Sequence, residues 1–133
     1  MKEIHFTVEG TPVPYARVVP MNRGGRRWAY KPKKTQDYGD WVSSVASEHA
    51  PAELLNGALS VEFHFYFARP KSRMNEKKYP YPDVKPDIDN CEKALQDAME
   101  SVIYTNDSRI VRKVSSKDYG LPERVEVTIR ELI

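Results

Sequence analysis

The sequence has few of the residues that several familiar chemistries need. Its single cysteine, Cys91, excludes an internal disulfide and fits a reducing compartment. Its histidines, His5, His49 and His64, are scattered singly, so no spacing typical of a zinc site is present. No Gly-rich phosphate loop or nucleophile elbow occurs, and no apolar run approaches the roughly 20 residues of a membrane span. We therefore expect a cytoplasmic protein without P-loop or zinc chemistry.

The length and composition are those of one ordinary globular domain. At 133 residues the chain suits a single domain, and we expect residues 1–133 to form it. It is 40% hydrophobic and 30% charged, which is not the composition of a disordered chain. The net charge of +2 says little by itself, but the charge is unevenly distributed.

One long stretch near the N-terminus carries charge of one sign only. From Gly10 to Gln36 there is no acidic residue, and the aromatic residues Tyr15, Trp28 and Tyr30 are interleaved with cations. These cations are Arg17, Arg23, Arg26, Arg27, Lys31, Lys33 and Lys34. A charge run is often only a solvated face. Here an unbroken positive sign together with aromatics favours an arm, flexible at Gly24-Gly25, that follows a phosphate backbone.

A second basic stretch lies between positions 69 and 85. It includes Lys71, Arg73 and Lys85, and it is rich in proline. Proline disfavours regular structure, so we expect an extended excursion over the surface.

Hydrophobic periodicity predicts four strands and two main helices. Strict alternation predicts a central strand over 59–67, and weaker alternation predicts strands at 4–8, 110–114 and 125–129. The turn sequence 118–122 predicts that the last two strands form a hairpin. One helix is expected to be capped by Thr35 and stopped by Pro51, and the other follows Asp89. The expected fold is a small α/β (α+β) domain with a mixed four-stranded sheet.

The carboxylates around the second helix form the most informative pattern. Asp87 and Asp89 precede the helix, and Asp107 follows it. On a helical wheel, Asp89, Lys93 and Asp97 lie opposite the apolar stripe. Asp89 with Glu92 also resembles a capping box, but a single cap does not explain the whole set. A divalent ion would offset the repulsion between Asp87 and Asp89, and oxygen ligands of this kind suit Mg²⁺.

Lys93 has two interpretations. It could stabilise negative charge on a phosphate or orient the attacking water, since it lies one turn from Asp89. Equally, it could form a plain i,i+4 salt bridge with Asp89 or Asp97. A calcium loop is excluded, because its sixth position would be Glu92 instead of glycine and its twelfth Ala98 instead of glutamate.

The run Lys85–Met99, followed by Asn106-Asp107-Ser108-Arg109-Ile110, resembles the RusA family of Holliday junction resolvases, which phages and prophages often encode. The segment 12–17 resembles the proline-rich segment, ending in arginine, that follows the first strand in this family. The resemblance implies an α/β, homodimeric, Mg²⁺-dependent enzyme, with Mn²⁺ as a substitute, in a bacterial or phage-infected cell. It implies that Asp87, Asp89 and Asp107 bind the metal and that Lys93 is catalytic. It assigns Asp97 no role beyond supporting Lys93.

The leading hypothesis is therefore an endonuclease that resolves four-way DNA junctions in recombination and repair. In this hypothesis the basic residues Arg17, Arg23, Arg26, Arg27, Lys31, Lys33, Lys71, Arg73 and Lys85 hold the DNA arms. The alternatives are a non-catalytic DNA-binding protein, in which the aspartates are caps and charge partners, and a broader nuclease acting on flaps or forks.

Overall fold

The computed structural model describes residues 2–16 and 19–133, and for 19–21 and 27–30 it describes the backbone. Its elements are β1 (Glu3–Glu9), β2 (Val19–Arg23), β3 (Arg26–Tyr30), α1 (Lys33–Ser47), β4 (Leu59–Phe67), α2 (Ile88–Met99), β5 (Ile110–Tyr119) and β6 (Arg124–Glu131). Two short 3₁₀ turns, Lys71–Arg73 and Asp107–Arg109, precede α2 and β5. The expected mixed four-stranded sheet with two helices is confirmed.

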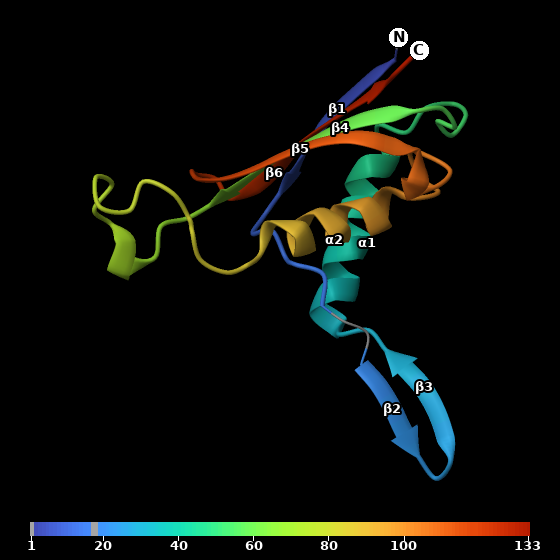
Figure 1. Ribbon diagram of the computed structural model, residues 1–133, viewed down its shortest axis with the longest axis horizontal. Coiled ribbons are helices and arrows are strands. Elements are labelled where there is room, and N and C mark those ends of the chain that lie inside the picture. The colour runs from blue at the N-terminus through green and yellow to red at the C-terminus, as the bar shows by residue number, and fades with distance from the viewer. Residues whose placement is uncertain (1, 17–18) are drawn as a thin grey trace.

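The main sheet has the strand order β1-β6-β4-β5, and both helices cover one of its faces (Figure 1). β4 pairs with β5 in parallel and with β6 antiparallel, so it is central as predicted. The alternation of apolar and polar residues along β4 explains its central position. Val61, Phe63 and Phe65 are fully buried, while the residues between them are half-buried on the open face. The core therefore lies between this face of the sheet and the helices.

α2 contributes its apolar stripe to the same core. Cys91, Leu95 and Met99 are fully buried, which confirms the helical-wheel prediction for this side of the helix. Burial raises the pKa of Cys91 to about 11, so the thiol stays protonated near neutral pH and is a core side chain. The opposite side of α2, with Asp89, Lys93 and Asp97, faces away from the sheet.

The predicted hairpin of the last two strands is wrong. β4 lies between β5 and β6, and β6 pairs on its other side with β1, with Phe6 opposite Val127. The turn after Tyr119 carries the chain across the end of β4, where the Gly120 amide donates to the Phe67 carbonyl at 3.0 Å. Inserting β6 there buries its apolar residues against β1 and β4 at once.

The Thr35 cap is also wrong. α1 begins at Lys33 with Pro32 in the capping position, so Thr35 lies in the first turn and is buried. Its hydroxyl oxygen accepts a hydrogen bond from the Ala16 amide at 3.2 Å, which ties the N-terminal segment to the helix.

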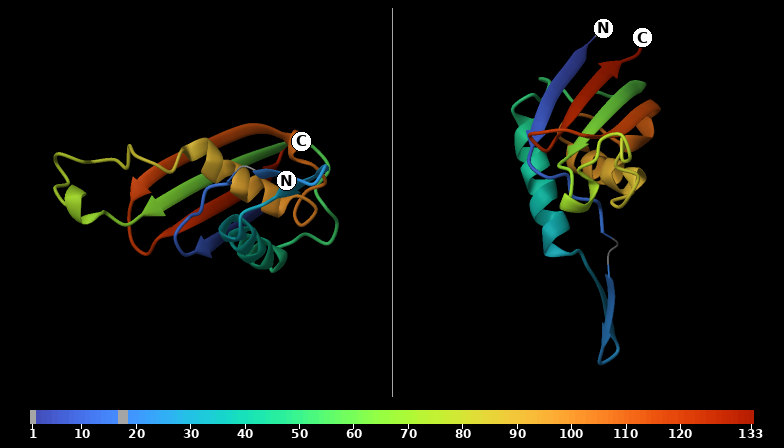
Figure 2. Two further views of the ribbon diagram at one scale, coloured as in Figure 1. Left: turned by 90° about the horizontal axis from the view of Figure 1, so that it is seen from below. Right: turned by 90° about the vertical axis from the view of Figure 1, so that its left-hand side faces the viewer.

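The first basic stretch contains a two-stranded hairpin, β2–β3, that the sequence did not predict. Gly24 and Gly25 form its turn with φ of 60° and 78°, values that favour glycine. The hairpin stands away from the sheet and helices, and the excursion over 68–86 extends beyond the end of the sheet in another direction (Figure 2). Among the described helices, none is long and apolar enough to cross a membrane.

Candidate active site

Asp87 and Asp89 lie at the start of α2, where the chain turns from the 68–86 excursion into the helix. Asp87 is the residue before the helix and Asp89 is in its first turn, and both are exposed. Within the described part of the chain, neither carboxylate accepts a hydrogen bond or forms an ion pair. Helix N-termini favour negative charge, which helps to hold two carboxylates here. The pair is therefore free to bind a cation.

The capping box considered for Asp89 and Glu92 is not formed. Glu92 is buried and points to β5, where it accepts a hydrogen bond from the Ser115 hydroxyl. The Lys113 ammonium lies 3.4 Å from the Glu92 carboxylate. Glu92 thus fixes α2 against the edge strand and leaves Asp89 without a capping role.

A cavity of about 480 Å³ opens beside Asp87. Lys34, Lys85 and Asn90 are among the residues that line it, together with Asp87. The Lys117 ammonium donates to the carbonyls of Val84 and Pro86 at 2.7 and 2.8 Å and holds the segment that leads into Asp87. A carboxylate and two cations therefore line one cavity.

Lys93 lies one turn further along α2. Its ammonium is 3.7 Å from the Asp97 carboxylate and 4.8 Å from the centre of the Tyr15 ring. The side chain is 54% exposed, so this ion pair contributes little to stability. Of the two salt bridges considered from the sequence, the one with Asp97 is present. Asp97 and Tyr15 together hold the Lys93 ammonium on the exposed side of α2.

Asp107 lies at the other end of α2. Asn106 caps the short turn that carries it, accepting from the Ser108 amide at 2.8 Å. Burial, followed by the charges of Asp107, Glu100 and Asp97, raises the pKa of Tyr104 well above its usual range. The Tyr104 hydroxyl donates to the Gln96 carbonyl at 2.7 Å, so the segment that leads to Asp107 lies beside the C-terminal half of α2.

The structure does not bring all three predicted metal ligands together in one chain. The helix between Asp89 and Glu100 is about 16 Å long at about 1.5 Å per residue. Accordingly, among residues 2–16 and 19–133 no three His, Cys, Asp or Glu side chains lie close enough to hold one metal ion. In one chain the three predicted ligands therefore lie in two places, Asp87 and Asp89 at the start of α2 and Asp107 after the helix.

The order of these features along the chain is that of a known nuclease family. The model of the family described as Endodeoxyribonuclease RusA matches residues 9–130, nearly the whole chain. The chain belongs to the RusA family. The protein YqaN of Bacillus subtilis strain 168, described as uncharacterized, is 37% identical over 137 residues, covering 97% of this chain and 96% of that protein.

Membership of the RusA family makes the protein an endonuclease of the class that resolves Holliday junctions. It confirms the resemblance seen in the sequence. Nucleases of this class generally use a divalent metal ion, which agrees with the unpaired carboxylates at the start of α2.

The basic residues expected to contact DNA in this RusA-family protein include residues of the hairpin, of the start of α1 and of the 68–86 excursion. Arg23 and Arg26 are exposed at the hairpin turn, and Lys33 is exposed at the start of α1. Lys31 is half-buried, with its ammonium 5.3 Å from the centre of the Tyr15 ring. Arg17 and the side chain of Arg27 lie outside the described residues.

On the 68–86 excursion, Lys71 and Lys85 are exposed. Arg73 is partly committed within the protein, because it donates to the Asp83 carboxylate at 2.7 Å and stacks on Tyr79. Of these three cations, Lys85 is nearest to the carboxylate pair, since it lines the same cavity as Asp87.

Sequence reasoning did not assign Asn90, Tyr15 or Lys117 to the site. Asn90 could have been found, because it completes the Asp-x-Asp-Asn motif. Tyr15 was visible as an aromatic in a basic stretch, but its contact with Lys93 depends on the Tyr15 amide donating to the Asn90 carbonyl at 2.9 Å. No sequence pattern indicates that Lys117 belongs to the site, because its position depends on the parallel pairing of β5 with β4.

Proposed function

We propose that this protein is a homodimeric, Mg²⁺-dependent endonuclease that resolves four-way DNA junctions in recombination and repair, in the cytoplasm of a bacterial or phage-infected cell. The observation that carries the proposal is the exposed pair Asp87 and Asp89, beside a cavity lined by Lys34 and Lys85. Lys93 lies one turn away on the same exposed side of α2. Family membership supports the same chemistry.

The donor set at the start of α2 fits Mg²⁺, with Mn²⁺ as a substitute. Asp87 and Asp89 supply carboxylate oxygens, which hard cations prefer, and their exposure leaves room for the waters that Mg²⁺ retains. When bound, the metal polarises the phosphate and lowers the pKa of an attacking water. Lys93 stabilises the negative charge that develops on the phosphate, held in place by Asp97 and Tyr15.

We further propose that Asp107 joins the site from a second copy of the chain. Mg²⁺ binds oxygens at about 2.1 Å, so two ligands of one ion lie within about 4 Å of each other. Among the described residues of one chain, Asp107 does not join Asp87 and Asp89 in a cluster that could hold one metal ion. In a two-fold dimer, each Asp107 can meet the Asp87 and Asp89 of the other copy, which creates two equal sites. Two such sites suit paired cuts in opposed strands of a junction.

The β2–β3 hairpin and the 68–86 excursion would hold the junction arms. Arg23, Arg26 and Lys71 are exposed on these projections, where they can reach phosphates that the sheet cannot. Contacts of this kind give affinity without reading sequence, and they predict strong weakening of binding by salt.

A nicking assay tests the proposal. The substrates are a synthetic four-way junction, the matched duplex, a flap and a fork, each with Mg²⁺ or with EDTA. We expect cleavage of the junction in Mg²⁺ only, with slower or no cleavage of the others. Preferential cutting of flaps or forks would instead support the broader nuclease, and no metal-dependent cutting of any substrate would reject the proposal.

The variant Asp89→Asn separates catalysis from binding. It removes one charge beside the phosphate, so it should abolish cleavage while junction binding stays equal or tightens. Asp37→Asn is the matched control, because Asp37 is an exposed carboxylate on α1 away from the pair. A non-catalytic DNA-binding protein would show no difference between the two variants.

A further inference from the structure

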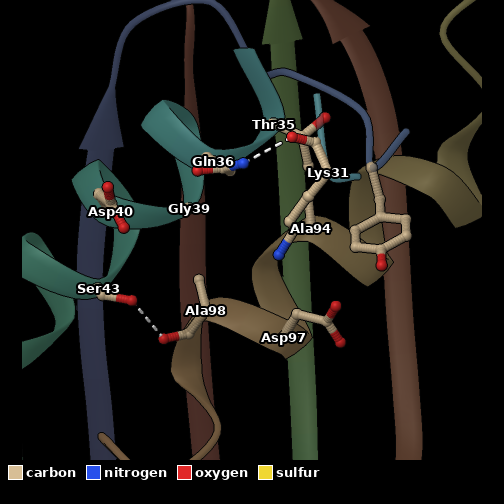
Figure 3. A pocket seen from close by; sticks show the side chains of 10 residues that line it. Lys31, Thr35, Gln36, Gly39, Asp40, Ser43, Ala94, Asp97 and Ala98 are labelled. Atoms are coloured by element: carbon tan, nitrogen blue, oxygen red, sulfur yellow. Dashed lines mark hydrogen bonds between the residues drawn. The ribbon is translucent and has the colours of Figure 1, made fainter. Parts of the chain in front are cut away.

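A second cavity, of about 210 Å³, lies between α1 and α2 (Figure 3). It is distinct from the cavity beside Asp87, although Tyr15 lines both. Sites for drug-sized ligands usually exceed about 300 Å³, so this cavity suits a smaller group. Lys31 and Asp40 come to it from the α1 side and Asp97 from α2.

One wall of the cavity is an aromatic ring with two ammonium groups over it. The ammonium groups of Lys31 and Lys93 lie 5.3 and 4.8 Å from the centre of the Tyr15 ring. The Tyr15 backbone is anchored to α2 by its hydrogen bond to Asn90. A fixed aromatic side chain in a positive surrounding is typical of a platform on which a nucleobase stacks.

Two carboxylates in the cavity remain available as hydrogen-bond acceptors. Ser43 is already committed to the Ala98 carbonyl at 2.7 Å, and the Gln36 amide nitrogen to the Lys31 carbonyl at 2.6 Å. The Asp40 carboxylate has no partner among the described side-chain contacts, and Asp97 has only its 3.7 Å pair with Lys93. Such carboxylates accept hydrogen bonds from the exocyclic amino groups of nucleobases, which thymine lacks.

We propose that this cavity binds a nucleobase with an exocyclic amino group, unstacked from the DNA beside the phosphate that is cut. The proposal rests on the proposed nuclease function. Tyr15 and Asp97 join the two sites, because both contact Lys93 and both line the cavity. A junction suits this arrangement, since unstacking a base costs least where pairing is already interrupted. The base stacks on Tyr15 in place of the Lys31 ammonium, while Lys93 keeps its contact with the ring. Asp40 reads the edge of the base.

The test uses junctions that differ only at the nucleotides flanking the mapped cut. One series carries each of the four bases there, and another carries an abasic residue. For the wild-type protein, the abasic residue should lower kcat/KM at least about fivefold, as expected from the loss of one stacked base. Tyr15→Ala should lower kcat/KM at least about fivefold more on the normal junction than on the abasic one, where only the loss through Lys93 remains. Tyr15→Phe keeps the ring and should behave like wild type.

Asp40→Asn tests the reading of the base edge. It should change the ratio of kcat/KM between amino-bearing bases and thymine by at least about fivefold. Asp37→Asn makes the same charge change on the same helix but outside the cavity, and it should leave the ratio unchanged.

Equal cutting of normal and abasic junctions by the wild type would overturn this proposal alone. It would also be overturned if the factors by which Tyr15→Ala and the abasic residue lower kcat/KM simply multiplied when combined. The same holds if Asp40→Asn and Asp37→Asn gave equal ratios of kcat/KM between amino-bearing bases and thymine. Absence of any junction cutting by the wild type would overturn it together with the proposed function. If Tyr15→Ala proves unstable in thermal unfolding, Tyr15→Phe and Asp40→Asn still decide the outcome.

Discussion

A metal site shared between two copies of the chain makes a specific prediction for mixed dimers. In the proposed shared site, Asp89→Asn should inactivate the half-site at the start of α2, and Asp107→Asn should inactivate the half-site that Asp107 supplies. Each variant alone should form dimers without cleavage. In a dimer of one Asp89→Asn chain and one Asp107→Asn chain, one site collects both defects and the other collects none. Two individually inactive variants should therefore regain activity together.

The expected recovery follows from the two-fold symmetry. A purified mixed dimer has one intact site of two, so it should nick at about half the wild-type rate per dimer. It should also cut a single strand of the junction, because the opposed site is inactive. Asp107 is assigned to the second copy because, among the described residues of one chain, no three His, Cys, Asp or Glu side chains cluster closely enough to hold a metal ion.

The mixed dimer can be obtained by co-expressing the two variants with different affinity tags and purifying on both. A mixed dimer of Asp89→Asn and Lys93→Ala is the matched control, because both changes lie at the same half-site and neither site is left intact. It should stay inactive. If the Asp89→Asn and Asp107→Asn mixture were as inactive as this control, the shared site would be refuted and all ligands would come from one chain.

Three further predictions concern Lys93, the hairpin and the core. Lys93→Ala should lower kcat by about 10²–10³-fold with little change in KM in single-turnover and steady-state assays, and an unchanged kcat would exclude its catalytic role. Replacing Arg23 or Arg26 by Ala should each reduce the slope of the logarithm of the binding constant against the logarithm of the salt concentration by about 0.9. The value of kcat at saturating DNA should stay constant. An unchanged slope would show that the hairpin does not contact DNA. Phe63 is fully buried in the central strand, so Phe63→Ala should cost about 3–5 kcal/mol in urea unfolding, and a loss below about 1 kcal/mol would contradict its place in the core.

The sequence predicted the elements whose pattern is set by burial. The alternation in β4 and the apolar stripe of α2 both follow from one side facing the core, and both are confirmed. The pairing of β5 with β6 could not be read from their turn, because a local turn does not reveal whether a third strand lies between. The β2–β3 hairpin was missed because its cationic residues give no alternating hydrophobic signal.

The candidate site was predicted as a set of residues but not as a geometry. The exposed side of α2 follows from the helical wheel, so the orientation of Lys93 and Asp97 could be foreseen. The distance of Asp107 from Asp89 could not, since it depends on where the chain goes after the helix ends. The contact between Lys93 and Tyr15 likewise depends on a segment that joins α2 only in the folded protein.

The most direct test of the proposed function is to map the cuts on a four-way junction labelled in turn on each strand. In Mg²⁺, the wild-type protein should produce two nicks at symmetric positions in one pair of opposed strands, and EDTA or Asp89→Asn should abolish both. Cuts that persist in EDTA, or nicks without two-fold symmetry, would contradict a dimeric, metal-dependent resolvase.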